Sequence, residues 1–190
     1  MTLDELVAGL TATDATTVLI DGRSGSGKST LADQLQHRWP ASSVVRLDDI
    51  YPGWDGLAWA VEHIGTALLE PRGRGRPGRW RQWDWAAGDA ADWHTVDPHR
   101  RLIVEGVGAL AGSHRRHADL GIWVHSPDDT RKERALQRDG DTFRPHWDRW
   151  AAQEEHLIAR TAPRSAADYV ATETGRGRSW TFTANDPDPA

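Results

Sequence analysis

The sequence has no cysteine among its 190 residues, which excludes disulfide bonds and thiolate metal sites. It has two lysines, so arginine carries almost all of the positive charge, and a single asparagine, Asn185. With no other asparagine, the N-K-x-D motif that reads guanine in GTPases is absent. No apolar run approaches the length that spans a membrane, and residues 1–10 carry two acids and no basic residue, unlike a signal peptide. We therefore expect a cytoplasmic protein with no membrane partner.

The composition is that of an ordinary globular chain, with 38% hydrophobic and 27% charged residues. The length fits a single domain covering residues 1–190. The formal net charge of -5 disfavours nucleic acid as the main partner, because phosphate neutralisation needs a basic surface. A small-molecule partner is the remaining expectation. Nothing in the sequence indicates the oligomeric state.

Short apolar runs alternate with amphipathic stretches along the chain. Buried strands are predicted at residues 16–20, 43–47, 101–104, 120–124 and 168–171. Helices are predicted at about 31–39, 57–68, 127–138 and 145–160. Residues 72–81 predict a mobile Gly/Arg/Pro-rich loop, and residues 185–190 a disordered tail. The alternation predicts an α/β fold, with a parallel sheet covered by helices on both faces.

A glycine-rich segment follows the first predicted strand. Residues 22–29 match G-x-x-x-x-G-K-[ST] at every fixed position, with a strand before and a helix after. In this pattern backbone N–H groups cradle phosphate oxygens, the lysine reaches the β- and γ-phosphates, and the final hydroxyl ligates Mg²⁺. The alternative, a Gly/Ser-rich turn with an incidental lysine, does not account for that context. We predict ATP and Mg²⁺ as cofactors, and the nucleotide-binding residues Gly22, Arg23, Ser24, Gly25, Ser26, Gly27, Lys28, Ser29 and Thr30.

Two carboxylates follow predicted strands, Asp48 after the second and Glu105 after the third. Ligands of open α/β sheets lie beyond the carboxyl ends of the strands, so both acids should face the same crevice as Lys28. For Asp48 and Asp49 a helix cap or turn pair is an equal alternative. Glu105 comes directly after an apolar run, where a buried carboxylate is costly without a partner such as a metal.

The glycine loop, Asp48-Asp49-Ile50-Tyr51 and Glu105-Gly106 together resemble the uridine kinase-like branch of the P-loop kinases. That branch includes uridine-cytidine kinases, phosphoribulokinase and pantothenate kinase. The resemblance, over residues 16–171, implies a three-layer P-loop NTPase fold with a small lid. It also implies transfer of the γ-phosphoryl group of ATP to a hydroxyl of a small metabolite, with nucleosides among the candidates. By the same resemblance Asp48 is the catalytic base, Tyr51 lies in the substrate pocket, and Glu105 holds Mg²⁺ directly or through water.

Three arginines, Arg131, Arg134 and Arg138, share one face of a predicted helix. The ordinary interpretation of such a stripe is a solvated face paired with nearby acids. The family resemblance instead places a mobile lid here, at about residues 131–150, whose arginines close over the transferred phosphoryl group. We therefore expect Arg134 and Arg138, with Lys28, to act in catalysis.

Residues 80–85 read Trp-Arg-Gln-Trp-Asp-Trp and occupy the place of a substrate-recognition motif in uridine kinases. Asp84 could hold hydroxyl groups of the substrate, and Trp83 could stack on a flat ring. Alternatively, these residues pack a small strand pair over the sheet. Two other functions stay open: a non-catalytic nucleotide-binding regulatory domain, and a P-loop kinase of the nucleoside-monophosphate or shikimate type.

Overall fold

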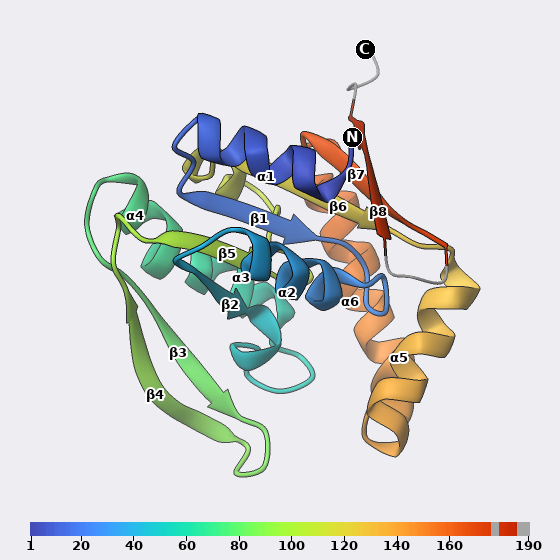
Figure 1. Ribbon diagram of the computed structural model, residues 1–190. Coiled ribbons are helices and arrows are strands. Elements are labelled where there is room, and N and C mark those ends of the chain that lie inside the picture. The colour runs from blue at the N-terminus through green and yellow to red at the C-terminus, as the bar shows by residue number, and fades with distance from the viewer. Residues whose placement is uncertain (176–178, 186–190) are drawn as a thin grey trace.

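The computed structural model describes residues 1–175 and 179–185, and its centre is a six-stranded sheet (Figure 1). In order across the sheet, the strands are β2 (Ser42–Arg46), β5 (Arg101–Glu105), β1 (Thr17–Asp21), β6 (Leu120–His125), β7 (Tyr169–Thr174) and β8 (Ser179–Ala184). The first five run parallel, and β8 pairs antiparallel with β7. The predicted α/β fold with a mostly parallel sheet is confirmed.

Helices cover both faces of this sheet. One face carries α1 (Leu3–Ala12) and α2 (Lys28–Arg38), and the other carries α3 (Leu57–His63), the π-helical η2 (Ile64–Leu69) and α6 (Trp147–Thr161). Successive strand residues point to opposite faces. In β1, accordingly, Val18 and Ile20 pack with α1 and α2, whereas Leu19 packs with α3 and η2. This alternation produces the three layers.

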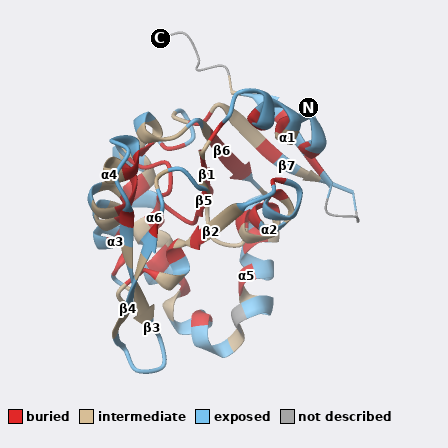
Figure 2. Ribbon diagram, turned by 60° about the vertical axis from the view of Figure 1, so that its left-hand side comes forward, coloured by how far each residue is buried: buried red, intermediate tan, exposed pale blue. Residues whose placement is uncertain are grey.

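Two elements project away from the sheet (Figure 1). One is the antiparallel hairpin of β3 (Gly78–Asp84) and β4 (Asp89–Val96). The other is α5 (Asp128–Phe143), followed by η4 (Arg144–His146). In α5 the backbone of Gly140 leaves helical geometry, with φ 51° and ψ −130°, close to the predicted helix end. Figure 2 shows that the central strands are buried whereas α5 and the hairpin tip are largely exposed.

The predicted loop over residues 72–81 is wrong. Its first residues form α4 (Glu70–Gly73), and Gly78 opens β3. Arg72 is buried, and its guanidinium donates hydrogen bonds to the carbonyl oxygens of Asp97 and, at 2.8 Å, of Arg100. An arginine that joins α4 to the turn at residues 97–100 in this way cannot be distinguished by composition from one in a solvated loop.

Two elements at the ends of the chain escaped prediction, α1 and β8. The helix α1 opens with a capping box, in which Thr2 and Glu5 exchange side-chain and backbone hydrogen bonds. In the predicted disordered tail, Asn185 is held in place, because its side-chain amide donates to the carbonyl oxygens of Arg164 and Ala167. Residues 186–190 lie outside the described part.

Within the described residues, no helix combines the length and apolarity needed to cross a bilayer.

Candidate active site

The glycine loop connects the end of β1 to the start of α2. Gly25 and Gly27 have φ of 78° and 102°, values that residues with a side chain rarely adopt. A Cβ atom at Gly25 would also lie 1.9 Å from the carbonyl oxygen of Arg131, so only glycine fits against α5 there. Lys28 begins α2 and is buried, and its Nζ donates to the carbonyl oxygen of Arg23 at 3.1 Å. The ammonium group is therefore held against the loop.

A cleft of about 610 Å³ opens over this loop. Of the predicted nucleotide-binding residues, six line it: Ser24, Gly25, Gly27, Lys28, Ser29 and Thr30. The predicted catalytic and metal residues Asp48, Glu105, Arg134 and Arg138 line the same cleft. Gly22, Arg23 and Ser26 belong to the loop but are not part of the cleft wall. Folding thus brings together residues from four separate segments of the sequence.

Glu105 reaches the cleft because β5 lies between β1 and β2, where it pairs with Ile20 and Arg46. Its carboxylate is buried, and burial raises its pKa above the ordinary value, while the charge of Lys28 opposes the shift. The Oε1 atom has no hydrogen-bond partner and lies 3.5 Å from Nε of Arg46. A buried carboxylate oxygen in this state is available to a cation.

The residues around Glu105 fit a magnesium ion. The Ser29 hydroxyl hydrogen-bonds to the Glu105 carboxylate, so a hydroxyl and a carboxylate oxygen meet beside the glycine loop. Mg²⁺ is usually held by one or two carboxylates together with substrate phosphates, rather than by a cage of protein ligands. No three His or acidic side chains of the described residues converge in metal-binding geometry.

Asp48 lies at the junction of two clefts. It sits in the short η1 turn (Leu47–Asp49) after β2, with its side chain 57% exposed. Its Oδ2 atom lies 3.9 Å from Nη2 of Arg138. Asp48, Arg138 and Ser24 line both the nucleotide cleft and an adjoining cleft of about 430 Å³. We call the second space the acceptor cleft; its other lining residues are Tyr51, Trp54, Trp85, Thr142, Phe143 and Trp150.

The structure brings one of the three predicted substrate residues to the acceptor cleft. Tyr51 lines it, whereas Trp83 and Asp84 do not. Trp83 pairs with Ala90 in the hairpin, and Oδ1 of Asp84 accepts backbone hydrogen bonds in the hairpin turn. Asp84 therefore caps the turn. The neighbouring Trp85 lines the cleft instead, and its indole N–H donates to the carbonyl oxygen of Asp48 at 2.8 Å.

The arginines of α5 divide between two environments. Arg131 is buried; its Nε atom lies 2.7 Å from Asp128 of the same helix, and its Nη1 atom lies 4.0 Å from Glu154 of α6. Arg134 and Arg138 line the nucleotide cleft, where Arg134 pairs with Glu173 of β7 at 2.8 Å. Two of the three arginines thus line the nucleotide cleft, and the third does not.

Asp21, at the end of β1, escaped the sequence analysis. Its buried carboxylate accepts backbone N–H bonds from Gly22 at 2.6 Å, Gly108 at 3.0 Å and Leu110 at 2.8 Å. These bonds tie the start of the glycine loop to the segment after β5. Burial raises the pKa of Asp21 to about 6. The signal was present, since Asp21, like Glu105, follows an apolar run and precedes glycine.

Glu154 of α6 is a second residue that sequence reasoning missed. It is fully buried, and Oε1 accepts from the Ser24 backbone N–H at 2.9 Å and the Ser24 hydroxyl at 2.6 Å. The indole N–H of Trp150 donates to the same oxygen at 3.0 Å, and Nε of Arg23 lies 3.2 Å from Oε2. No local pattern marks this carboxylate, because its partners in the loop are about 130 positions away.

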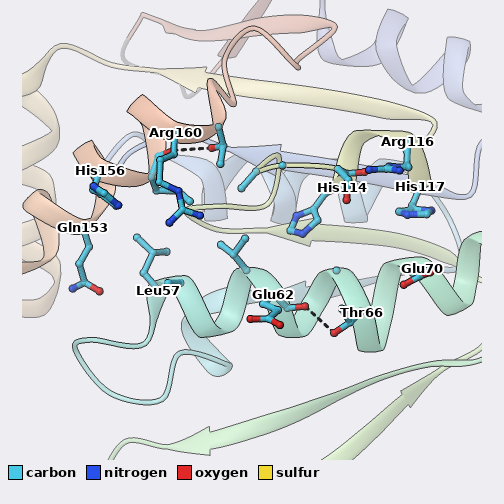
Figure 3. A pocket seen from close by; sticks show the side chains of 18 of the residues that line it. Leu57, Glu62, Thr66, Glu70, His114, Arg116, His117, Gln153, His156 and Arg160 are labelled. Carbon is cyan, nitrogen blue, oxygen red and sulfur yellow. Dashed lines mark hydrogen bonds between the residues drawn. The ribbon is translucent and has the colours of Figure 1, made fainter.

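A cleft of larger volume, about 910 Å³, lies elsewhere (Figure 3). It opens between α3 with η2 on one side and α6 on the other, with η3 (His114–His117) at one end. Glu62 and Thr66 face it from the first side and His156 and Arg160 from the second. None of the residues predicted for the site lines it. We therefore assign the active site to the cleft over the glycine loop, because the predicted residues line that cleft.

A parallel sheet, a glycine loop at the start of a helix and two carboxylates at neighbouring strand ends define a P-loop NTPase fold of the kinase-like kind. Comparison with protein-family models matches residues 18–145 to the AAA domain family, and the chain belongs to that family. A comparison with curated proteins gave no match.

Solved structures of two named kinases share the fold. A possible uridine kinase from Bacillus stearothermophilus aligns with a TM-score of 0.64 and 21% identity, over 88% of this chain and 96% of that one. A candidate fructose transport system kinase from Silicibacter sp. TM1040 aligns with a TM-score of 0.54 and 21% identity, over 88% and 95%. The resemblance to the uridine kinase-like branch is thus confirmed at the level of the fold.

Proposed function

We propose that the protein is a kinase that transfers the γ-phosphoryl group of ATP, with Mg²⁺, to a hydroxyl of a small metabolite. One observation carries the proposal: Asp48 lies where the nucleotide cleft and the acceptor cleft meet. A carboxylate between a phosphate cradle and a second ligand space is positioned to orient or deprotonate an acceptor. A domain that only bound nucleotide would not need it there.

Nucleotide binding rests on the glycine loop. Its backbone N–H groups and the first turn of α2 hold the phosphate oxygens, and Lys28 moves from the Arg23 carbonyl to the β- and γ-phosphates. Ser29 and Glu105 would hold magnesium, which neutralises charge on the phosphate oxygens when it is bound. Asp21 and Glu154 position the first half of the loop, because they accept the backbone N–H bonds of Gly22 and Ser24.

The transfer step follows from the position of Asp48. The acceptor hydroxyl gives its proton to the Asp48 carboxylate while its oxygen forms a bond to the γ-phosphorus. The bond between the γ-phosphorus and the β–γ bridging oxygen breaks, and ADP leaves with that electron pair. Arg134 and Arg138, which line the nucleotide cleft, stabilise the negative charge on the transferred group. We propose that residues 131–150 act as the lid that excludes water from this step.

The charges of the acceptor cleft support a hydroxyl acceptor over a nucleoside monophosphate. Arg138 is the one cation among the described residues that line this cleft, and it faces Asp48 at 3.9 Å. Arg131 pairs with Asp128, and Arg134 pairs with Glu173. An acceptor that already carried a phosphate would bring two negative charges next to a carboxylate with little compensation.

A metabolite-panel assay tests the proposal. The protein is incubated with ATP, Mg²⁺ and pooled hydroxyl compounds, and products that have gained one phosphoryl group are detected by mass spectrometry. We expect at least one phosphorylated product, lost in Lys28→Ala. Tight binding of Mg-ATP with no product from any pool would favour the regulatory domain instead. A product carrying a newly formed diphosphate would favour the nucleoside-monophosphate type.

A further inference from the structure

The acceptor cleft is walled by aromatic rings from four separate segments. Trp54 is the central ring: His146 stacks on it at 4.4 Å and Phe143 at 5.4 Å, and its centroid lies 5.0 Å from Trp85 and 6.4 Å from Trp150. Tyr51 packs edge-on against Trp150 at 4.8 Å. Trp85 comes from the hairpin turn, Phe143 from α5 and Trp150 from α6. Such a wall offers a ligand a large apolar contact area at little cost in conformational entropy.

The polar atoms of three of these rings are already bonded to the protein. The Tyr51 hydroxyl donates to the carbonyl oxygen of Val107 at 2.8 Å, and the Trp85 N–H donates to that of Asp48. The Trp150 N–H donates to the Ser24 hydroxyl at 2.9 Å and to Glu154. These rings therefore present only their faces and C–H edges to an occupant. A ligand with several hydroxyls, or with the polar edge of a nucleobase, would leave groups unpaired at a cost in binding free energy.

The charged groups that line the acceptor cleft lie at one place. Asp48 and Arg138 stand 3.9 Å apart at the mouth that opens onto the nucleotide cleft. The negative charge of Asp48 offsets the positive charge of Arg138. This mouth therefore favours a neutral group over an anion. The cleft thus combines a largely aromatic wall with one charged end, an arrangement suited to a flat ring that carries a hydroxyl.

We propose that the acceptor cleft binds an uncharged alcohol whose hydroxyl is carried on an aromatic or otherwise flat apolar ring. The ring packs against the exposed part of Trp85, and the hydroxyl reaches Asp48. Trp85 is 42% exposed, so part of its ring is available to an occupant. The role of this alcohol as phosphoryl acceptor rests on the proposed kinase function. Its binding to the cleft can be tested without turnover.

The test uses 2-naphthalenemethanol as the probe, with glycerol and ribose as polar comparisons. Binding is followed by ligand-observed NMR in the presence of Mg²⁺ and a non-hydrolysable ATP analogue. We expect saturable binding of the probe and none of the two polyols. Trp85→Leu should raise the probe Kd about three- to tenfold, the range expected for one ring–ring contact. Trp85→Phe, which keeps a ring but loses the indole N–H, should change it less.

Trp93→Leu is the matched control, because Trp93 belongs to the same hairpin, is 48% exposed and does not line the acceptor cleft. Equal probe affinity in Trp85→Leu and Trp93→Leu would overturn the inference. So would a panel product that is a polyol or sugar phosphate, which would leave the kinase function standing. Saturable probe binding that depends on Trp85, with no phosphoryl transfer to any compound, would instead support the cleft assignment and contradict the kinase function.

Discussion

Replacing Glu154 with alanine should destabilise the protein by about 3 kcal/mol. Glu154 is 0% exposed and accepts hydrogen bonds from Ser24, Trp150 and Arg23. Removing one partner of a buried ion pair costs roughly 3–5 kcal/mol, because the opposite charge stays buried without compensation. We take the lower end, because both arginines near Glu154 have a second acidic partner. Arg23 also pairs with Glu155 at 3.3 Å, and Arg131, which lies 4.0 Å from Glu154, also pairs with Asp128 at 2.7 Å. At roughly 2–4 °C per kcal/mol for a chain of this size, the Tm should fall by about 10 °C.

The assay is urea unfolding followed by tryptophan fluorescence, with Glu155→Ala as the control. Glu155 is the next residue, pairs with the same arginine and has a side chain that is 69% exposed. An exposed ion pair contributes about 0–1 kcal/mol, so this control should stay close to the parent protein. Glu154→Ala should also weaken Mg-ATP binding, because Ser24 of the glycine loop loses its anchor. Equal free energies of unfolding in the two variants would refute the proposed role of Glu154 as an anchor.

Three further predictions concern the loop and its surroundings. Gly25→Ala should abolish Mg-ATP binding in calorimetry, because its Cβ would lie 1.9 Å from the Arg131 carbonyl oxygen; binding of normal heat and affinity would contradict the loop geometry. The carboxyl of Asp21 should titrate in NMR near pH 6, and a midpoint near the ordinary 3.8 would contradict its burial. Because the folded-state pKa is the higher one, the stabilising contribution of Asp21 is complete below about pH 4 and is lost as the pH rises through 6. Glu105→Gln should raise the Mg²⁺ concentration for half-maximal ATP binding about tenfold, measured by Mg²⁺ titration at fixed ATP, whereas an unchanged midpoint would exclude Glu105 from the metal site.

The sequence predicted the parts of the fold that local patterns specify. A β-branched run, a glycine motif and an amphipathic stretch are each a few residues long, so strand β1, the loop and helix α2 could be read directly. Asp48 and Glu105 could be placed together because the carboxyl ends of parallel strands share one edge of a sheet. The capping box at Thr2 and the buried position of Asp21 were also local signals, and they were overlooked.

The remaining features depend on contacts between distant segments. Glu154 meets Ser24 across about 130 positions, and Trp85 meets the Asp48 carbonyl across 37. The sequence analysis predicted that Asp84 and Trp83 bind the substrate. In the structure both residues pair within the hairpin, and Trp85, in the turn that follows, lines the acceptor cleft. Which of several neighbouring tryptophans lines a cleft is decided by the register of the hairpin and by the position of the hairpin against the domain. Neither is encoded in local periodicity.

The most direct test of the account compares Asp48→Asn with the parent protein, using the acceptor that the metabolite panel identifies. The substitution keeps the size of the side chain and removes its capacity to accept a proton. We predict Mg-ATP affinity within about twofold of the parent and a transfer rate lower by about 10²- to 10⁴-fold, the range for a lost general base. Transfer at the parent rate would contradict the central claim, because the carboxylate at the junction of the two clefts would then play no part in the chemistry.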